Sequence, residues 1–303
     1  MLVTRPGEGC AKLPGVTELP GVPRVPRVRT IPLAAVAVLG VSVLMVPVLM
    51  VTVLGITALT SCAAQQPGPP QLRVQVLATL PHDKTMYTQG LEIADGMLYE
   101  SSGRVGESRV RASALSGPAA AGAAVLREAV LPAPLFGEGI TVAGSRLWQL
   151  TWTSGVAIER DPVTLAERRR VSYHGAGWGL CAEGNRLVMS DGSDRLTFRD
   201  PATFARTGQV AVRLGGEPVP DLNELECAAG SVWANVYRTD RILRIDPATG
   251  TVTGVVDASG LLDAEQRATA DVLNGIAAIP GTDEFLITGK YWPTLLRVRF
   301  VPS

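Results

Sequence analysis

Apolar and polar residues alternate from Gln71 to Leu80, which predicts a β-strand because successive side chains of a strand point to opposite faces. After this strand, five segments repeat one pattern: a short opening, a glycine a few residues later, and then an apolar strand. The openings are Gln89-Gly90-Leu91, Glu138-Gly139-Ile140, Trp178-Gly179-Leu180, Asn223-Glu224-Leu225 and Asn274-Gly275-Ile276. The matching apolar positions are Leu98, Leu147, Leu187, Val232 and Phe285. The pattern predicts an all-β domain.

The openings recur every 40 to 51 residues. A period of this length with short strands is typical of a β-propeller that has one four-stranded blade per repeat, so we expect five blades. The strand from Gln71 to Leu80 is expected to pair with the strand from Leu295 to Val301, which would join the two ends of the domain.

Smaller elements are also predicted. Asp161, Asp200 and Asp246 each precede a proline, and Asp-Pro pairs mark turns between outer strands. We expect one short helix from Leu262 to Ala270, with Asp263 near its start. The Gly/Ala/Pro-rich stretch from Ser116 to Ala124 is expected to be a mobile surface loop.

The repeat also locates a candidate site. Its first slot holds Gln89, Glu138, Trp178, Asn223 and Asn274, and a second slot fourteen residues later holds Gly103, Trp152, Gly192 and Tyr237. The fifth repeat carries two extra residues, so Lys290 falls in its second slot. Equivalent slots of a propeller form rings around its axis, and a purely structural slot would hold similar residues in every repeat. The diverse polar and aromatic side chains therefore predict a functional cavity at one mouth of the domain.

Composition excludes some classes of function. The chain has 28 basic and 28 acidic side chains, so it lacks the basic excess that is typical of nucleic-acid-binding proteins. The two histidines are His82 and His174, and neither an HExxH motif nor a pair of CxxC motifs occurs, so a zinc site with the usual ligands is not expected. Ser190-Asp191-Gly192 can be interpreted as an exposed catalytic triplet or as a strand that ends in a turn. His82 and Asp83 can shape the site entrance or serve in a structural loop.

The first 61 residues are interpreted as an N-terminal extension and export signal. Arg24, Arg27 and Arg29 precede an apolar run from Ile31 to Leu59 that is long enough to span a bilayer. The run ends in Leu59-Thr60-Ser61-Cys62, which resembles a bacterial lipobox, and the resemblance implies lipid attachment to Cys62. An uncleaved membrane anchor and an ordinary signal peptide remain alternatives. A Pro/Gln-rich linker at 62–71 then leads to the domain at 72–303, which we expect outside the cytoplasm as a monomer.

Cys181 and Cys227 lie in different slots of the repeat, since Cys181 matches Thr141 whereas Cys227 matches Val142. Neighbouring residues on a strand face opposite sides, so we expect these two side chains to point apart as small core residues without a disulfide.

Several segments together resemble the plant- and bacterial-type glutaminyl-peptide cyclotransferases from about Leu72 to Phe300. These segments are Pro81-His82-Asp83, Tyr87-Thr88-Gln89-Gly90-Leu91, Phe136 to Thr141, Leu150-Thr151-Trp152, Gly177 to Leu180, Ser190-Asp191-Gly192, Leu222 to Glu226, Ala234 to Tyr237, Leu273 to Ile276 and Thr288 to Pro293. The resemblance implies a five-bladed propeller that cyclises an N-terminal glutaminyl residue to pyroglutamyl and releases ammonia.

The resemblance also implies residue roles. Glu138 would be the acid/base. Gln89, Asn223 and Lys290 would contact the substrate amide or backbone, and Trp152, Trp178 and Tyr237 would form the aromatic pocket. No metal or organic cofactor is implied. Two positions depart from the family pattern: Tyr237 stands where the plant proteins carry tryptophan, and Lys84 stands where proline is expected.

Two alternative functions remain at this point. A non-catalytic propeller lipoprotein could bind envelope proteins or glycans through the same mouth. A metal-dependent lactonase-type hydrolase usually has six blades and a central acidic cluster, whereas five repeats are present here.

Overall fold

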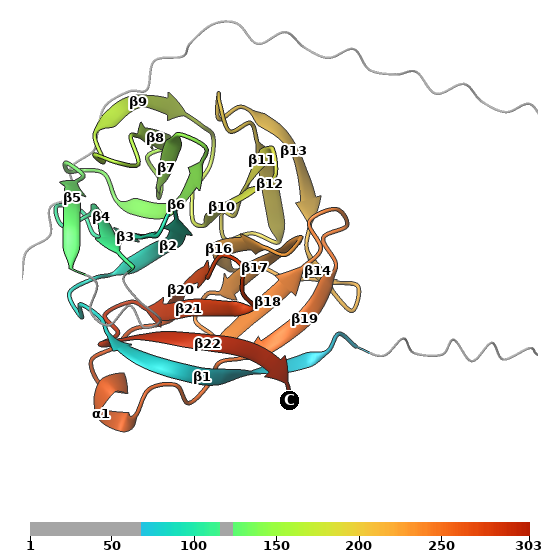
Figure 1. Ribbon diagram of the computed structural model, residues 1–303. Helices are drawn as coiled ribbons and strands as arrows, with labels where there is room; N and C mark the ends of the chain where they lie inside the picture. The colour runs from blue at the N-terminus through green and yellow to red at the C-terminus, as the bar shows by residue number, and fades with distance from the viewer. Residues whose placement is uncertain (1–67, 116–123) are drawn as a thin grey trace, which may run out of the picture. The chain divides into compact units, whose positions relative to one another are not determined.

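The computed structural model describes residues 68–115 and 124–303, which belong to a compact unit from Ala63 to Ser303 (Figure 1). The predictions about the export signal, about Cys62 and about most of the loop at 116–124 lie outside the described residues. Within the described ranges, no helix is long and apolar enough to cross a membrane.

The described domain is all-β, as the repeats predict, and three of its sheets each contain four antiparallel strands in sequence order. The first sheet comprises β2 (Thr88–Ala94), β3 (Met97–Ser102), β4 (Arg109–Ala114) and β5 (Val125–Val130). The second comprises β6 (Gly137–Ala143), β7 (Arg146–Thr151), β8 (Val156–Arg160) and β9 (Glu167–Ser172). The third comprises β10 (Leu180–Glu183), β11 (Arg186–Met189), β12 (Arg195–Arg199) and β13 (Arg206–Ala211).

The largest sheet has eight strands and joins two antiparallel groups. One group comprises β16 (Leu222–Ala228), β17 (Ser231–Val236), β18 (Arg241–Ile245) and β19 (Val252–Asp257). The other comprises β20 (Leu273–Ala278), β21 (Glu284–Gly289), β22 (Thr294–Pro302) and β1 (Gln71–Pro81). A two-stranded hairpin of β14 (Arg213–Leu214) and β15 (Glu217–Pro218) lies between the third sheet and β16 in the sequence.

The predicted pairing of the two ends of the domain is confirmed. β1 runs antiparallel to β22, with Val74 opposite Phe300 and Leu80 opposite Leu295. The start of β1 also pairs in parallel with β19, with Gln71 opposite Val255, and this short ladder joins the two groups of the largest sheet. The sequence pattern did not predict this second pairing.

The first strands of the sheets meet at the centre of the domain (Figure 1). β2 contacts β6 and β20, β10 contacts β6 and β16, and β16 contacts β20, so these strands form a closed ring. The opening glycines allow the strands to come this close. A Cβ atom on Gly139 would lie 2.6 Å from the carbonyl oxygen of Trp178, and one on Gly179 would lie 2.1 Å from that of Asn223. Glycine is therefore required in these openings by the approach of one strand backbone to the next.

The fourth opening has Glu224 in place of glycine. The Glu224 carboxylate accepts hydrogen bonds from the backbone N–H groups of Leu91 at 3.2 Å and of Ile276 at 2.9 Å. Burial raises the pKa of Glu224 well above its usual range. This side chain bridges β2 and β20 from the ring interior and does not line the cavity described below.

The predicted apolar positions form the core between the sheets. Leu147, Leu187 and Val232 have no exposed surface, and Leu98 and Phe285 are also buried. Each of the five is the second residue of the second strand of its four-stranded group. One periodic slot therefore supplies equivalent core contacts around the domain.

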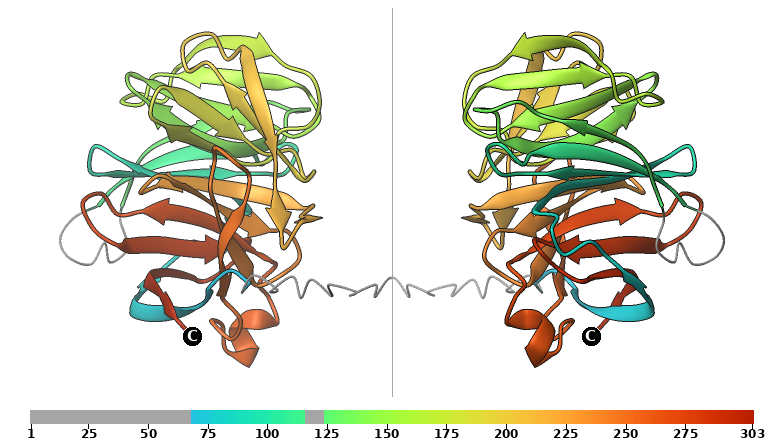
Figure 2. Two further views of the ribbon diagram at one scale, coloured as in Figure 1. Left: turned by 90° about the vertical axis from the view of Figure 1, so that its right-hand side faces the viewer. Right: turned by 90° about the vertical axis from the view of Figure 1, so that its left-hand side faces the viewer.

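The predicted turns and helix are also present. Asp161 accepts hydrogen bonds from the backbone N–H groups of Val163 and Thr164, and Asp200 and Asp246 make similar turns. The helix α1 (Ala264–Arg267) is shorter than expected, and Asp263 is its N-cap, with Gln266 completing a capping box. It lies outside the strands at the end of the domain where β1 and β22 pair (Figure 1 and Figure 2).

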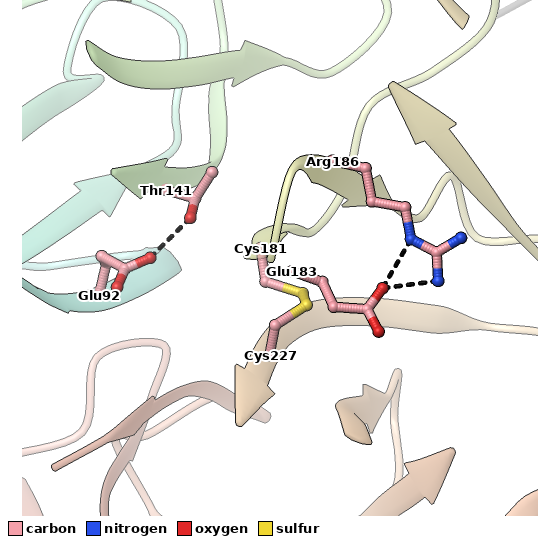
Figure 3. Close-up of a disulfide and its surroundings, with 6 residues drawn as sticks. All are labelled: Glu92, Thr141, Cys181, Glu183, Arg186 and Cys227. Atoms are coloured by element: carbon pink, nitrogen blue, oxygen red, sulfur yellow. Dashed lines mark hydrogen bonds and ion pairs between the residues drawn. A yellow bond between two sulfur atoms is a disulfide. The ribbon is translucent and has the colours of Figure 1, made fainter. Parts of the chain in front are cut away.

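The prediction that Cys181 and Cys227 do not pair is wrong. The two residues form a disulfide between β10 and β16, with Cα atoms 5.4 Å apart (Figure 3). The prediction assumed that two side chains must point to the same face of a sheet in order to meet, which holds only when both strands belong to one sheet. Here one face of the third sheet meets the opposite face of the next group, so side chains in slots of opposite parity point toward each other. A disulfide between neighbouring sheets therefore requires cysteines in adjacent slots of the repeat, as Cys181 and Cys227 are.

Candidate active site

All seven side chains predicted for the site line one cavity of about 340 Å³. Its lining residues are Tyr87, Gln89, Phe136, Glu138, Trp152, Trp178, Asn223, Tyr237, Arg238 and Lys290. Gln89, Glu138 and Asn223 lie at the starts of β2, β6 and β16, and Trp178 lies shortly before β10. Trp152, Tyr237 and Lys290 directly follow β7, β17 and β21. The start of a first strand and the end of its antiparallel second strand lie at the same end of a sheet, which brings the two slots together.

Glu138 is the acidic residue of the cavity. Its side chain is 4% exposed, and among the described residues its hydrogen-bond partner is Gln89 Nε2, which donates to Glu138 Oε1 at 3.2 Å. No arginine or lysine of the described residues forms a direct ion pair with it. Burial raises the pKa of Glu138 well above its usual range, and the charge of Lys290 offsets this rise only in part. The group can therefore bind and release a proton at a pH nearer neutrality than an exposed glutamate does.

A chain of amides orients this carboxylate. Asn274 Nδ2 donates to Gln89 Oε1 at 3.3 Å and to the Thr88 carbonyl at 3.0 Å. These bonds fix the Gln89 amide so that its nitrogen faces Glu138. Asn274 occupies the same repeat slot as Gln89 but does not line the cavity, so it acts on the cavity through Gln89.

Lys290 provides the buried cation of the cavity. Its ammonium nitrogen lies 4.8 Å from the ring centre of Tyr87 and 5.0 Å from that of Tyr237, so both rings are within cation–π distance of it. Burial lowers the pKa of Lys290, whereas the charges of Glu138 and Asp271 raise it. Asn223 presents a second polar group, and its Oδ1 atom is buried without a hydrogen-bond partner.

Aromatic rings form the outer walls. Tyr87, Phe136 and Trp152 follow one another, with ring centres 6.2 Å and then 5.7 Å apart. A second aromatic pair is formed by Trp178 and Tyr237, which meet edge to face with ring centres 5.5 Å apart. Trp152 is 44% exposed, whereas Glu138 and Lys290 are almost fully covered. The aromatic groups therefore surround the entrance and the charged groups lie deeper.

Three lining residues were missed by the sequence interpretation: Tyr87, Phe136 and Arg238. Tyr87 and Phe136 both stand two residues before a first-slot residue, which is a repeat signal that could have identified them. Gly103 in the second slot is a further signal. A Cβ atom there would lie 2.3 Å from the Phe136 ring, so the glycine leaves the space that the aromatic ring fills. Arg238 directly follows the second-slot residue Tyr237, as Arg104 follows Gly103, so its place in the repeat is also a signal that could have identified it.

His82 and the Ser190-Asp191-Gly192 segment, for which the sequence left both a functional and a structural role open, lie outside this cavity. His82 is buried between the Trp292 carbonyl and the Glu100 carboxylate, at 2.7 and 2.9 Å. Ser190 Oγ accepts from the Gly179 N–H and donates to the Asn223 carbonyl, so it ties neighbouring strands together. Asp191 accepts from Ser193 in a turn. The geometry of Ser190-Asp191-Gly192 is that of a strand ending in a turn.

Within 68–115 and 124–303, no group of three or more His, Cys, Asp or Glu residues is placed to hold a metal ion. The chemistry available in the cavity is that of one carboxylic acid, one ammonium group, one guanidinium group, side-chain amides and aromatic walls. This set is suited to proton transfer and to stabilisation of a developing oxyanion.

The fold and the cavity define a propeller-like all-β domain with an aromatic-walled cavity that holds a buried carboxylate. The chain belongs to the glutamine cyclotransferase family, whose model matches residues 48–300. It is 38% identical over 232 residues to glutaminyl-peptide cyclotransferase from Arabidopsis thaliana, and the match covers 75% of this chain and 71% of the relative. The crystal structure of Myxococcus xanthus glutaminyl cyclase is similar, with a TM-score of 0.69 and 38% identity, and the match covers 78% of this chain and 99% of that chain.

The aromatic wall provides a test of where substrate binds. Trp178→Ala is expected to raise KM by about tenfold to a hundredfold, because a packed aromatic contact at the centre of a site contributes on the order of 2 kcal/mol or more. Tyr237→Trp keeps an aromatic wall at this position and is expected to change KM by less than about threefold. Steady-state kinetics measure both effects, and circular dichroism checks folding. Unchanged kinetics of folded Trp178→Ala would place the substrate elsewhere.

Proposed function

We propose that this protein is a glutaminyl-peptide cyclotransferase, which converts an N-terminal glutaminyl residue of a peptide or protein to pyroglutamyl and releases ammonia. Family membership and the printed functions of the two relatives support this activity. The observation that carries the proposal is Glu138, a buried carboxylate with a raised pKa in a cavity of amide, ammonium and aromatic groups. A module that only binds proteins or glycans has no need of such a group.

In the proposed reaction the α-amine of the substrate attacks the carbonyl carbon of its own side-chain amide. A carbon–nitrogen bond forms to give a five-membered ring, and the bond to the amide nitrogen breaks. Glu138 accepts the proton that the attacking nitrogen loses and donates it to the leaving nitrogen, which departs as ammonia. One carboxylate thus serves both proton transfers, and it returns to its starting state.

The other predicted site residues would bind and orient the substrate. Lys290, Asn223 and Gln89 offer polar groups to the substrate amide and backbone, and a donor among them can stabilise the negative charge that develops on the carbonyl oxygen. Trp152, Trp178 and Tyr237 would hold the side chain folded back onto the amine and exclude water.

The direct test is incubation of the purified domain with a dipeptide that begins with glutamine. Ammonia release together with a loss of one ammonia mass from the peptide is the expected result. The matched control is the same dipeptide with an acetylated N-terminus, which has no free amine to attack. Absence of ammonia from the free dipeptide would contradict the proposed function.

The domain at 72–303 is proposed to be a five-bladed β-propeller. The three four-stranded sheets and the two antiparallel groups of the eight-stranded sheet support this description, as does the ring of first strands. In this arrangement β1 supplies the outermost strand of the blade that contains β20, β21 and β22.

We propose that the activity does not require a metal ion, because the groups needed for proton transfer and charge stabilisation are side chains of the cavity. Prolonged incubation with EDTA is expected to leave kcat and KM unchanged. The measurement is the ammonia assay before and after chelation, with re-addition of zinc as the control. Activity that disappears with chelator and returns with zinc would refute the proposal.

We also propose that the protein is exported and carries a lipid on Cys62, after cleavage of the signal before that residue. The Cys181–Cys227 disulfide supports export, because disulfides persist mainly in oxidising compartments. Cys62→Ala is expected to leave an unprocessed precursor without acyl modification. Mass spectrometry of the wild-type N-terminus measures this, and a mature N-terminus at another residue would contradict lipid attachment.

A further inference from the structure

A second hollow lies next to the catalytic cavity. It has a volume of about 290 Å³ and is called the exit groove here; it is lined by Arg238, Thr239, Asp240, Arg267, Ala270, Asp271 and Val272. Arg238 is the residue that lines both hollows. The backbone joins them as well, because the Asp271 N–H donates to the Lys290 carbonyl at 2.8 Å and the Lys290 N–H donates to the Val272 carbonyl at 2.9 Å.

The proposed reaction requires such an exit. The substrate's first residue must reach Glu138, which is 4% exposed, so the rest of the peptide has to leave through the mouth. An extended peptide advances about 3.3–3.6 Å per residue, so the second and third residues of the substrate would already lie near the rim. The exit groove borders this rim and offers mostly polar groups to a peptide backbone.

Arg238 is held at the boundary by its own turn. Its backbone has a φ of 62°, and the turn is fixed by hydrogen bonds from Thr239 N and Thr239 Oγ1 to the Val236 carbonyl. The guanidinium carbon lies 5.1 Å from the ring centre of Tyr237, which is a wall of the catalytic cavity. The stacking restricts the guanidinium, and a stacked guanidinium keeps its N–H donors available for a carboxylate.

Arg238 lies in a groove that also contains Arg267, Asp240 and Asp271. Among the described residues Arg238 forms no ion pair, whereas Arg267 in the same groove lies 3.8 Å from Asp240. The negative charge of Asp271 interacts with Lys290 and favours the charged form of that side chain, which raises the pKa of Lys290. On the other side of the mouth, Arg104 also stacks on a wall residue, 5.0 Å from the Tyr87 ring centre, and its Nε donates to Tyr291 Oη at 2.9 Å. Because Asp240 is paired with Arg267, Arg238 is the cation of the groove that has no ion-pair partner among the described residues.

We infer that Arg238 binds a carboxylate of the peptide substrate one or two residues beyond the cyclising glutamine, and that the exit groove holds this part of the chain. The inference rests on the proposed function and adds a substrate preference to it. The carboxylate can be an acidic side chain or, in a dipeptide, the C-terminal carboxylate. A basic residue at the same position would be repelled by Arg238 and would be disfavoured.

The test compares kcat/KM for three amidated peptides, Gln-Glu-NH2, Gln-Ala-NH2 and Gln-Lys-NH2, and for Gln-Ala with a free C-terminus. The wild-type domain is expected to prefer Gln-Glu-NH2 over Gln-Ala-NH2 by about fivefold, which corresponds to a partly exposed ion pair. Preference for Gln-Ala with a free C-terminus over its amide would identify the C-terminal carboxylate as a second source. Raising the salt concentration from about 0.05 to about 0.5 M should reduce each preference.

Arg238→Gln is the decisive variant, because it removes the charge but keeps a long polar side chain. The ratio of the two kcat/KM values is expected to fall to about one, and any loss common to both peptides cancels in this ratio. Arg241→Gln is the matched control; it removes an exposed positive charge three residues away that lines neither hollow, and it should keep the wild-type ratio.

The outcomes separate the two proposals. Ammonia from every peptide without a preference for glutamate would overturn the inference and leave the proposed function standing. A preference that persists in folded Arg238→Gln would also overturn it. Absence of ammonia from all peptides with the wild-type domain would refute the proposed function and this inference together.

Discussion

Replacing Glu138 by glutamine is expected to lower kcat by ~10²–10⁴-fold, the usual contribution of general acid–base catalysis. The variant keeps the size and shape of the side chain and can still bond to Gln89, but it cannot accept the proton of the attacking amine. Substrate binding should therefore survive, so KM is expected to change much less than kcat. The measurement is steady-state ammonia release from a glutamine-initiated dipeptide.

The pH dependence gives an independent readout of the same residue. As the base, Glu138 must be ionised, so kcat/KM of the wild-type enzyme should rise with pH through the raised pKa of Glu138. Lys290 lowers this pKa by its positive charge, so Lys290→Met is expected to raise the pKa of Glu138 further and to move the acidic limb to higher pH. In Glu138→Gln the limb that belongs to this carboxyl group should be absent.

Glu226→Gln is a matched control for Glu138→Gln. Glu226 is also a buried glutamate on a first strand, and its pKa is also raised mainly by burial, but it does not line the cavity. Its neutral replacement is expected to retain near wild-type activity. Thermal melting confirms that each variant is folded. Folded Glu138→Gln protein that still cyclises peptides at nearly the wild-type rate would remove Glu138 from the mechanism.

Removing the Cys181–Cys227 disulfide is expected to destabilise the domain by about 4 kcal/mol. The two cysteines are 46 residues apart in sequence, and closing a loop of that length removes unfolded-state entropy of about this magnitude. For a domain of this size the melting temperature should fall by roughly 8–16 °C. Differential scanning calorimetry measures the change.

The double variant Cys181→Thr and Cys227→Val is the suitable test, because Thr141 and Val142 occupy the matching slots of the second repeat. Reductant should lower the melting temperature of the wild-type domain toward that of the variant and should not affect the variant. A double variant that melts at the wild-type temperature would show that the disulfide contributes no stability.

The sequence predicted the features that depend on periodicity. Leu147, Leu187 and Val232 recur in one slot because each sheet packs in the same way, so their burial follows from the repeat. The meeting of Glu138 and Lys290 in one cavity also follows, since equivalent slots of repeats arranged around an axis converge. Their roles in the reaction remain predictions.

The sequence did not predict features that depend on how one sheet meets the next. The face of Cys181 was assigned correctly within its own strand, but its partner belongs to a neighbouring sheet that presents its opposite face. The parallel ladder between Gln71 and Val255 was missed for a similar reason, because it joins two neighbouring groups of strands and not two strands of one repeat. Arg238 was missed because it stands one residue after the second slot, in a turn whose positive φ the sequence pattern did not reveal.

The pairing of β1 with β22 has a consequence for the order of events during biosynthesis. β1 is the first strand of the domain to be translated and β22 is the last, with more than 200 residues between their midpoints. At ~5–20 residues per second, the nascent β1 waits for roughly 10–45 s before its partner exists. Until β22 exists, the edges of β1 and β21 that pair with it are open. Chaperone protection during this interval would therefore be of most use at β1. Loss of β22 by premature termination would leave the polypeptide with two unpaired edges and a propensity to aggregate.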